Sequence, residues 1–338
     1  KFAVQSRILR AEHEDDHYGA AVFKYLRTMA VMQQSSGASV LFVCMDDKAK
    51  VPIGEPNRPT STNVRSRPSL VMSASPNTAM DHDLTKCSLT PSVILCCNIP
   101  EKADGSFYRG QVDVRLKDSV FQPSNPFLHM AELSASVHVH HDTCPPVVCV
   151  YTDGGTDHRV TCKSVQLAYI AFFLKEDVDL LVAARTCPGH SYANPAERVM
   201  STLNLGLQNA AFARSAMTDE MESRVKQANS MAAIRNVASQ HQQLKEDWKT
   251  SLKTVLEELQ SRFKRLAYSG ESVQVPEIQA DTGMRDVITQ TWPDIDLTKL
   301  TAKDLANKDG FQQFLSSHCR LRHYTFQIRK CGSTECKL

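Results

Sequence analysis

The sequence predicts an α/β fold in which helices flank a mixed sheet, with an antiparallel meander first and parallel strands after it. Strand-like apolar runs in the first half follow one another without a helix between them, which favours antiparallel pairing. Later apolar runs alternate with helical segments, which favours parallel pairing through right-handed crossovers. A polar, helical stretch follows the last of these strands, so we expect a helical C-terminal extension.

Three strands form the expected meander. Residues 39–45, 92–97 and 110–116 are runs of strand length, and the third has the strict alternation of a half-exposed strand. Residues 51–85 are rich in Pro, Ser, Asn and Arg. We therefore expect a long loop there, with residues 69–72 as its only strand-like stretch.

Helices and strands alternate in the second half. Asn125 and Pro126 supply a cap and a first-turn proline, so a helix is expected from there to Leu133. Residues 146–151 and 179–184 are the fourth and fifth strands; a helix over 164–174 separates them, and another begins at 194. Three meander strands followed by helix, strand, helix, strand and helix is the order of an RNase H-like core.

The chain divides into four expected parts. A helical lead covers 1–38, the RNase H-like core covers 39–213, a long helical segment covers 214–270, and a small module covers 271–338. The long segment has an apolar stripe at helical spacing and a basic opposite face. A packing helix with a solvated face and a helix that contacts DNA or a second copy both fit this pattern. The stripe consists of Trp248, Leu252, Val255, Leu259, Phe263 and Leu266.

Composition restricts the class of protein more than its function. The 338 residues are 42% hydrophobic, which suffices for a sizeable core, and the net charge of +2 alone does not indicate a nucleic-acid binder. No run approaches the roughly 18–20 apolar residues of a membrane span. Eleven cysteines, several of them inside apolar strands, favour a reducing compartment: the nucleus in a eukaryote, the cell interior otherwise. The start at Lys1, without a secretory signal, suggests a fragment lacking its N-terminal part.

Three carboxylates lie at element ends where a metal site can form. Asp46 ends the first strand, Asp153 ends the fourth, and Glu197 lies in the first turn of the helix after the fifth. In such a sheet these positions meet at the carboxyl ends of the strands. Mg²⁺ prefers oxygen ligands, and two ions about 3.5–4 Å apart can stabilise both oxygens of a phosphodiester displacement. The sequence therefore predicts a two-metal site, with Asp47 as the substitute for Asp46.

Each carboxylate also has a local explanation. Asn194, Pro195 and Glu197 occupy the cap, first-turn and capping-box positions of a helix start. Asp153 with Gly154 is a common turn pair, and Asp46 fits a solvated strand end. Three unrelated local explanations coincide, in the correct fold order, less often than any one of them occurs alone. The combination therefore favours the metal site.

At this point the chain resembles the DDE superfamily of cut-and-paste DNA transposases. The motifs are Val43-Cys-Met-Asp46-Asp47, Tyr151-Thr-Asp153-Gly-Gly155 and His190-Ser-Tyr-Ala-Asn194-Pro195-Ala-Glu197-Arg198, and the likeness covers residues 39–207 in order. The resemblance implies Asp46, Asp153 and Glu197 as ligands of two Mg²⁺ or Mn²⁺ ions. It further implies a water or a 3′-hydroxyl as nucleophile, with DNA strand cleavage and transfer as the reaction.

Two other functions remain open beside a transposase: a domesticated, non-catalytic derivative that keeps DNA or protein binding, and an RNase H-like nuclease. A purely structural interaction protein is a further alternative. We expect DNA as the partner, neither a membrane nor a small-molecule substrate, and leave a homo-oligomer open. The candidate DNA-contacting residues are Arg159, Arg185, His190, Arg198, Lys249 and Lys253.

Histidine and cysteine residues suggest further sites. Thiolate with imidazole is what zinc prefers, and a zinc site and unrelated free cysteines both fit the C-terminal set. Its members are His318, Cys319, Cys331 and Cys336. Asp157 and His158 follow the second carboxylate and fit either water orientation or a surface helix start. The histidines at 138, 140 and 141 are expected in a solvated loop.

Overall fold

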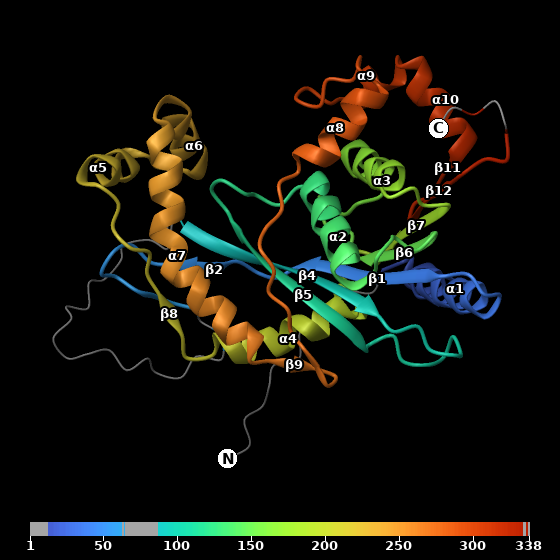
Figure 1. The fold of residues 1–338 in the computed structure, drawn as a ribbon, viewed down its shortest axis with the longest axis horizontal. Helices are drawn as coiled ribbons and strands as arrows, with labels where there is room; N and C mark the ends of the chain where they lie inside the picture. The colour runs from blue at the N-terminus through green and yellow to red at the C-terminus, as the bar shows by residue number, and fades with distance from the viewer. Residues whose placement is uncertain (1–12, 63, 65–86, 334–335, 337–338) are drawn as a thin grey trace.

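The computed structural model describes residues 13–62, 64, 87–333 and 336 of the chain (Figure 1). The strand expected over 69–72 lies outside these residues. Within them, no helix is both long enough and apolar enough to cross a membrane.

A mixed sheet forms the centre of the molecule. Its core strands are β1 (Val40–Asp47), β4 (Cys87–Cys97), β5 (Gly110–Asp118), β6 (Val147–Thr152) and β7 (Leu180–Arg185). They lie in the order β5-β4-β1-β6-β7, with β1, β6 and β7 parallel and β4 antiparallel to both β1 and β5. This order and these directions confirm the predicted RNase H-like fold, in which a meander precedes parallel strands.

Short strands complete the sheet. β2 (Val51–Ile53) pairs with the first residues of β4, on the opposite side of β4 from β5. Beyond β7 the sheet is extended, because β12 (Thr325–Arg329) pairs antiparallel with β7 and β11 (Cys319–Leu321) pairs with β12. The segment over 271–338, which we expected to form a small module, therefore contributes two strands to the main sheet (Figure 1).

Helices cover both faces of the sheet (Figure 1). On one face lie α2 (Pro126–His140) and α3 (Lys163–Lys175), whose buried residues share a core cluster with one set of alternating strand side chains. On the other face lie α1 (Asp16–Ser35), α4 (Ala196–Leu207) and α7 (Gln242–Lys264), which share the second cluster with the opposite set. This alternation follows from the two-residue period of a strand.

Shorter elements complete the chain, and the helical segment expected over 214–270 contains three helices. Its first two helices are α5 (Asp219–Gln227) and α6 (Met231–Gln240), and its third is α7. The remaining elements are β3 (Thr60–Ser61), η1 (Ser191–Ala193), β8 (Ala211–Phe212), β9 (Ala267–Tyr268), β10 (Glu271–Ser272), α8 (Thr282–Thr291), α9 (Ala302–Ala306) and α10 (Asp309–His318).

His138 and His140 lie in the last turn of α2, so the expectation of a loop is wrong for these two, whereas His141 follows the helix end and is exposed. The helix continues past Leu133 because the polar residues of its last turns find buried partners: Ser136 accepts a hydrogen bond from Arg115, at 2.8 Å. His138 Nε2 lies 2.8 Å from a Glu176 carboxylate oxygen, and His140 Nε2 lies 3.2 Å from Asp113 Oδ1.

Trp248 fixes α7 against the sheet. Its indole is fully buried, and Nε1 donates a hydrogen bond of 3.1 Å to Asp118 Oδ2 at the end of β5. The Arg214 guanidinium lies 5.3 Å from the ring centre and pairs with Glu222. The apolar stripe predicted for this helix is thus its packing face, buried from Trp248 to Phe263.

We expect Trp248→Ala to lower the free energy of unfolding by about 3–5 kcal/mol, because it leaves a large cavity and removes the indole hydrogen bond to Asp118. Urea denaturation followed by circular dichroism measures the change. Lys249→Ala on the exposed side of the same helix is the control and should shift stability by about 0.5 kcal/mol or less. Equal midpoints for the two variants would contradict this packing role.

Candidate functional site

Asp46 and Asp153 leave adjacent parallel strands at the same edge of the sheet. The β1–β6 ladder ends with Met45 opposite Thr152, so the next residue on each strand is one of the two aspartates. Two positions earlier, the side chains of both strands pack into the core beneath α4. Because strand side chains alternate, Asp46 and Asp153 lie on that same face.

Glu197 is brought to this edge by a contact between the start of α4 and the end of β1. The fully buried Asn194 donates from Nδ2 to the Met45 carbonyl oxygen at 2.9 Å, and its Oδ1 accepts from the Ala196 N–H at 3.2 Å. Glu197 follows in the first helical turn. Within the described part of the chain, its carboxylate makes no capping-box hydrogen bond, so the local explanation as a cap is not realised.

Negative charge concentrates around Asp46, which is only 6% exposed. Burial first, and then the charges of Asp153, Glu197 and Asp47, raise the pKa of Asp46 to about 9. Three converging carboxylates form an oxygen-only donor set, and a divalent cation would remove their mutual repulsion. The residues present therefore fit Mg²⁺ or Mn²⁺.

The spacing of the carboxylates differs from that of a single-ion cluster. Among the described residues, groups of three ligand atoms within 4.8 Å of one another occur at His129, Asp157 and His158 and in the C-terminal segment, and not at the three carboxylates. The three carboxylates therefore do not have the spacing of a closed shell around one ion.

Asp47 faces the opposite side of the sheet and is already paired. Its carboxylate accepts hydrogen bonds of 2.8 and 2.9 Å from Lys117 Nζ and another from the Ser124 hydroxyl. Burial alone would raise the pKa of Asp47, but the charges of His129 and Lys117 outweigh it and hold the pKa below its ordinary value. Asp46, and not its neighbour, is therefore the carboxylate directed towards Asp153 and Glu197.

The turn after β6 orients Asp153. Asp153 Oδ1 accepts from the Gly155 N–H at 2.9 Å, and its carbonyl oxygen accepts from the Thr186 hydroxyl at 2.6 Å. Gly154 has a φ of +78°, where a side chain would be strained. The turn and a ligand role are compatible here, because the turn holds the carboxylate in place.

His129 connects the two strand ends from behind. Its buried Nε2 lies 2.9 Å from Asp157 Oδ2 and 4.0 Å from Asp47 Oδ2, while Nδ1 lies 3.8 Å from Glu132. Its ring packs on that of His158 at 4.2 Å between centroids. Sequence reasoning missed His129, although a His and a Glu three residues apart in an otherwise apolar helix were a signal.

The two stacked histidines carry different charges. Burial and Lys117 lower the pKa of His129, but Asp47 and hydrogen bonds to Asp157 and Glu132 outweigh them and raise it to about 9. Burial and the charge of His129 lower the pKa of His158 to about 4. Burial alone would raise the pKa of Asp157, yet the bond from His129 holds it low. Near neutral pH, His129 is therefore a cation and His158 is neutral.

The predicted DNA-contacting residues fall into two groups. His190 Nε2 lies 2.7 Å from Asp16 Oδ1. Arg185 is 4% exposed, donates to the His323 carbonyl oxygen at 3.2 Å and stacks on Tyr324 at 4.5 Å, which leaves little surface for a phosphate. The exposed group consists of Arg159, Arg198, Lys249 and Lys253.

The C-terminal zinc candidates are brought together in part. Ligand atoms of His318, Cys331 and Cys336 all lie within 4.8 Å of one another. Cys319 packs against the apolar core under α3 and does not belong to this group.

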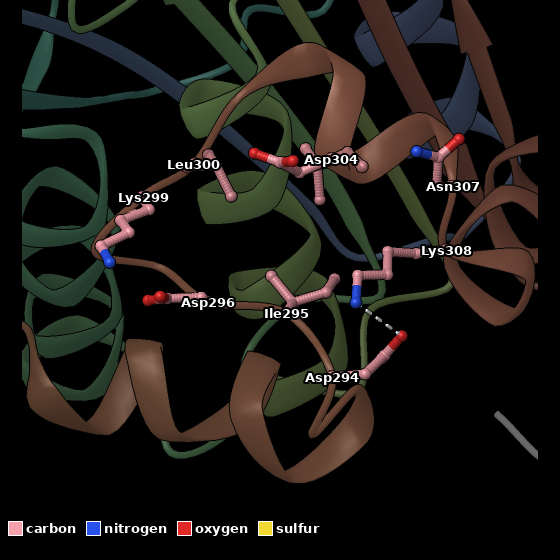
Figure 2. A pocket seen from close by; sticks show the side chains of 9 residues that line it. Asp294, Ile295, Asp296, Lys299, Leu300, Asp304, Asn307 and Lys308 are labelled. Carbon is pink, nitrogen blue, oxygen red and sulfur yellow. Dashed lines mark ion pairs between the residues drawn. The ribbon is translucent and has the colours of Figure 1, made fainter.

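A surface pocket lies elsewhere, around α9 and the segment that follows α8 (Figure 2). Lys308 and Asp294 face each other across it and form an ion pair of 3.2 Å. Asp296 and Asp304 also line the pocket, and none of the three carboxylates does. We therefore do not place the chemistry there.

Comparisons with known proteins give weak structural likenesses. No protein-family model and no curated protein matches the sequence. The solved Mos1 mariner paired-end complex with Mn is 12% identical, with a TM-score of 0.35 over 75% of this chain and 67% of that one. The pre-cleavage Mos1 transpososome is 9% identical, with a TM-score of 0.32 over 75% and 67%. The Mos1 strand transfer complex is 11% identical, with a TM-score of 0.30 over 75% and 66%.

Opposite effects on stability are expected for the two neighbouring aspartates. The folded state keeps a proton on Asp46 that the unfolded state releases above pH 3.8, so wild type loses stability as pH rises towards 9. Asp46→Asn should therefore raise the metal-free melting temperature at neutral pH, with a gain that vanishes towards pH 4. Asp47→Asn should destabilise by about 1.5–3 kcal/mol, the value of a hydrogen bond to a charged group. Calorimetry with a chelator checks both, and a shared sign would contradict the assignment.

The pH dependence of folding should also report His129. The folded state holds its proton up to about pH 9, whereas the unfolded state releases it near 6.5. Stability from this group is thus complete below 6.5 and is lost as pH rises to 9. Because Asp46 lowers stability over the same range, His129→Gln should make the urea-denaturation stability fall less steeply with pH, without removing the fall. His141→Gln, at an exposed histidine, leaves the His129 contacts intact and should keep the wild-type slope; a shallower slope in that control would disprove the explanation.

Proposed function

We propose that Asp46, Asp153 and Glu197 hold two Mg²⁺ or Mn²⁺ ions and that the chain cleaves and transfers DNA strands as a transposase does. The observation that carries the proposal is the convergence of the three carboxylates on one face, from two adjacent parallel strand ends and the first turn of α4.

The chain's own residues bind and orient in this proposal. When bound, such ions stabilise the attacking and leaving oxygens of a phosphodiester displacement. Asp46 and Asp153 are held by the β1–β6 ladder, and Glu197 by the Asn194 bond to Met45. Asp46 must lose its proton to become a ligand, so metal binding should strengthen as pH rises.

Exposed cations support a phosphate-backbone substrate. Arg198 follows Glu197 directly in α4. Arg159 comes two residues after Asp157, whose carboxylate lies close to Gly155, as does that of Asp153. Helix α7 packs beside α4 and exposes Lys249 and Lys253 (Figure 1). Guanidinium and ammonium groups of this kind fix the register of a nucleic acid through its phosphates. A modest net charge is compatible with such local positive charge.

A non-catalytic, transposase-derived binding protein is the second candidate. The polar exposed face of α7 would serve it equally well. The raised pKa of the buried Asp46 beside two further carboxylates favours catalysis, because a strongly shifted ionisable group at a strand edge is typical of functional sites. An RNase H-like nuclease would use the same carboxylates and differ in its products.

The test is strand nicking of a supercoiled plasmid in Mg²⁺ or Mn²⁺. Asp153→Asn and Glu197→Gln should slow nicking by at least about 100-fold, because losing a ligand costs more than the 10–100-fold of losing its hydrogen-bond partner. Asp294→Asn changes a surface acid in the pocket of Figure 2 and should nick at the wild-type rate.

Equal nicking by wild type and Asp153→Asn would show that the carboxylates do not carry the activity. A second assay offers a DNA fragment with a free 3′-hydroxyl and scores its covalent joining to the plasmid. Joining is expected for a transposase. Cleavage without joining would favour the nuclease, and plasmid binding with neither reaction would favour the non-catalytic derivative.

A further inference from the structure

A cluster of one imidazole and two thiols lies where the end of the chain meets α10. His318 is the last residue of α10, Cys331 follows the end of β12, and Cys336 comes five residues later. Their ligand atoms all lie within 4.8 Å of one another, and Cys336 Sγ is 3.3 Å from His318 Nε2. A tetrahedral zinc ion, with bonds of about 2.3 Å to sulfur and 2.0 Å to nitrogen, spaces its ligand atoms roughly 3.5–3.8 Å apart.

The imidazole is oriented for this task. His318 is 5% exposed, and its Nδ1 lies 3.0 Å from the Arg329 carbonyl oxygen, to which Nδ1–H donates. That bond leaves the Nε2 lone pair facing the thiols. The ring also packs flat on Phe314, with centroids 4.7 Å apart. Metal-bound histidines usually have their second ring nitrogen fixed by such a hydrogen bond.

The backbone holds the two cysteines close to the histidine. Lys330 N–H donates to the Asp179 carbonyl oxygen at 2.9 Å, and Lys330 Nζ lies 2.7 and 2.8 Å from the Asp179 and Asp177 carboxylates. Cys331 is thus tied to the loop before β7. The Cys336 N–H donates to the Ser333 carbonyl oxygen at 3.3 Å.

We propose that His318 Nε2 and the thiolates of Cys331 and Cys336 bind one zinc ion that fastens the end of the chain to α10 and β12. Two sulfurs with one imidazole nitrogen match the preference of zinc. A Cys331–Cys336 disulfide would use the thiols but leave His318 Nε2 without a role. The zinc site is remote from the three carboxylates in sequence and differs from them in ligand chemistry. The result of the zinc-binding test is therefore independent of the proposed DNA chemistry.

The test measures metal in the full chain, purified without a histidine tag. Mass spectrometry of the metal content should find one zinc per chain in wild type, and titration with Co²⁺ should give thiolate-to-metal charge-transfer bands. Cys331→Ser, Cys336→Ser and His318→Gln should each weaken zinc binding by at least about 100-fold. Cys319→Ser is the matched control, because its thiol lies next to His318 in sequence yet packs into the core.

Three results would overturn the proposal. They are absence of bound zinc and of cobalt bands in wild type, equal zinc affinity in Cys331→Ser and wild type, and a Cys331–Cys336 disulfide in protein purified from a reducing cytoplasm. Thermal melting separates loss of metal from loss of fold. In buffer without Mg²⁺ or Mn²⁺, a zinc-selective chelator should lower the melting temperature of wild type and of Cys319→Ser, and it should leave that of Cys336→Ser unchanged.

Discussion

The parallel pairing of β1 with β6 is the interaction on which the site depends. It sets Asp46 beside Asp153, because the ladder ends one residue before each of them. These strands lie in the middle of the sheet and are covered on both faces. The two aspartates are therefore attached to a buried part of the molecule. Glu197 joins them only because Asn194 spans from α4 to the Met45 carbonyl oxygen. A site built on ladder and cap hydrogen bonds is preorganised before any ligand binds.

The neighbouring residues Asp46 and Asp47 lie on opposite faces of the sheet, and their pKa values are shifted in opposite directions. On the α2 face, Asp47 has Lys117, Ser124 and His129 as partners, and its pKa is lowered. On the α4 face, Asp46 meets only other carboxylates among its charged neighbours, and its pKa is raised to about 9. The two-residue period of a strand makes this separation possible within a single dipeptide. Because Lys117 and His129 lie behind the sheet beside Asp47, Asp46 keeps a surrounding of negative charge, which costs stability without a metal and favours binding of one.

The main features of the site could be predicted from sequence because they depend on local signals. An apolar run ending in Asp46, a turn at Asp153 and a capped helix start before Glu197 are each visible within about ten residues. His129 and Lys117 could not be found in this way, since their role depends on which side chains face each other across separate elements. The strand β12 was also missed, but for another reason. Tyr324, Phe326 and Ile328 alternate with polar residues, a strand signal that sequence reasoning overlooked, and only the choice of β7 as partner required the structure.

The C-terminal strands bear on the site through β7. This strand leads through η1 to Glu197, and its last residue, Arg185, donates its backbone N–H to the Tyr324 carbonyl oxygen at 3.1 Å. Tyr324 also stacks against the Arg185 guanidinium and donates its hydroxyl to Asp15 at 2.6 Å. Segments close to both ends of the chain therefore meet where the connection to the third carboxylate begins. The contacts of Tyr324 with Arg185 and Asp15 hold the start of β12 against the end of β7. They stabilise the strand that leads to Glu197, so the C-terminal segment supports the site without contributing a ligand to it.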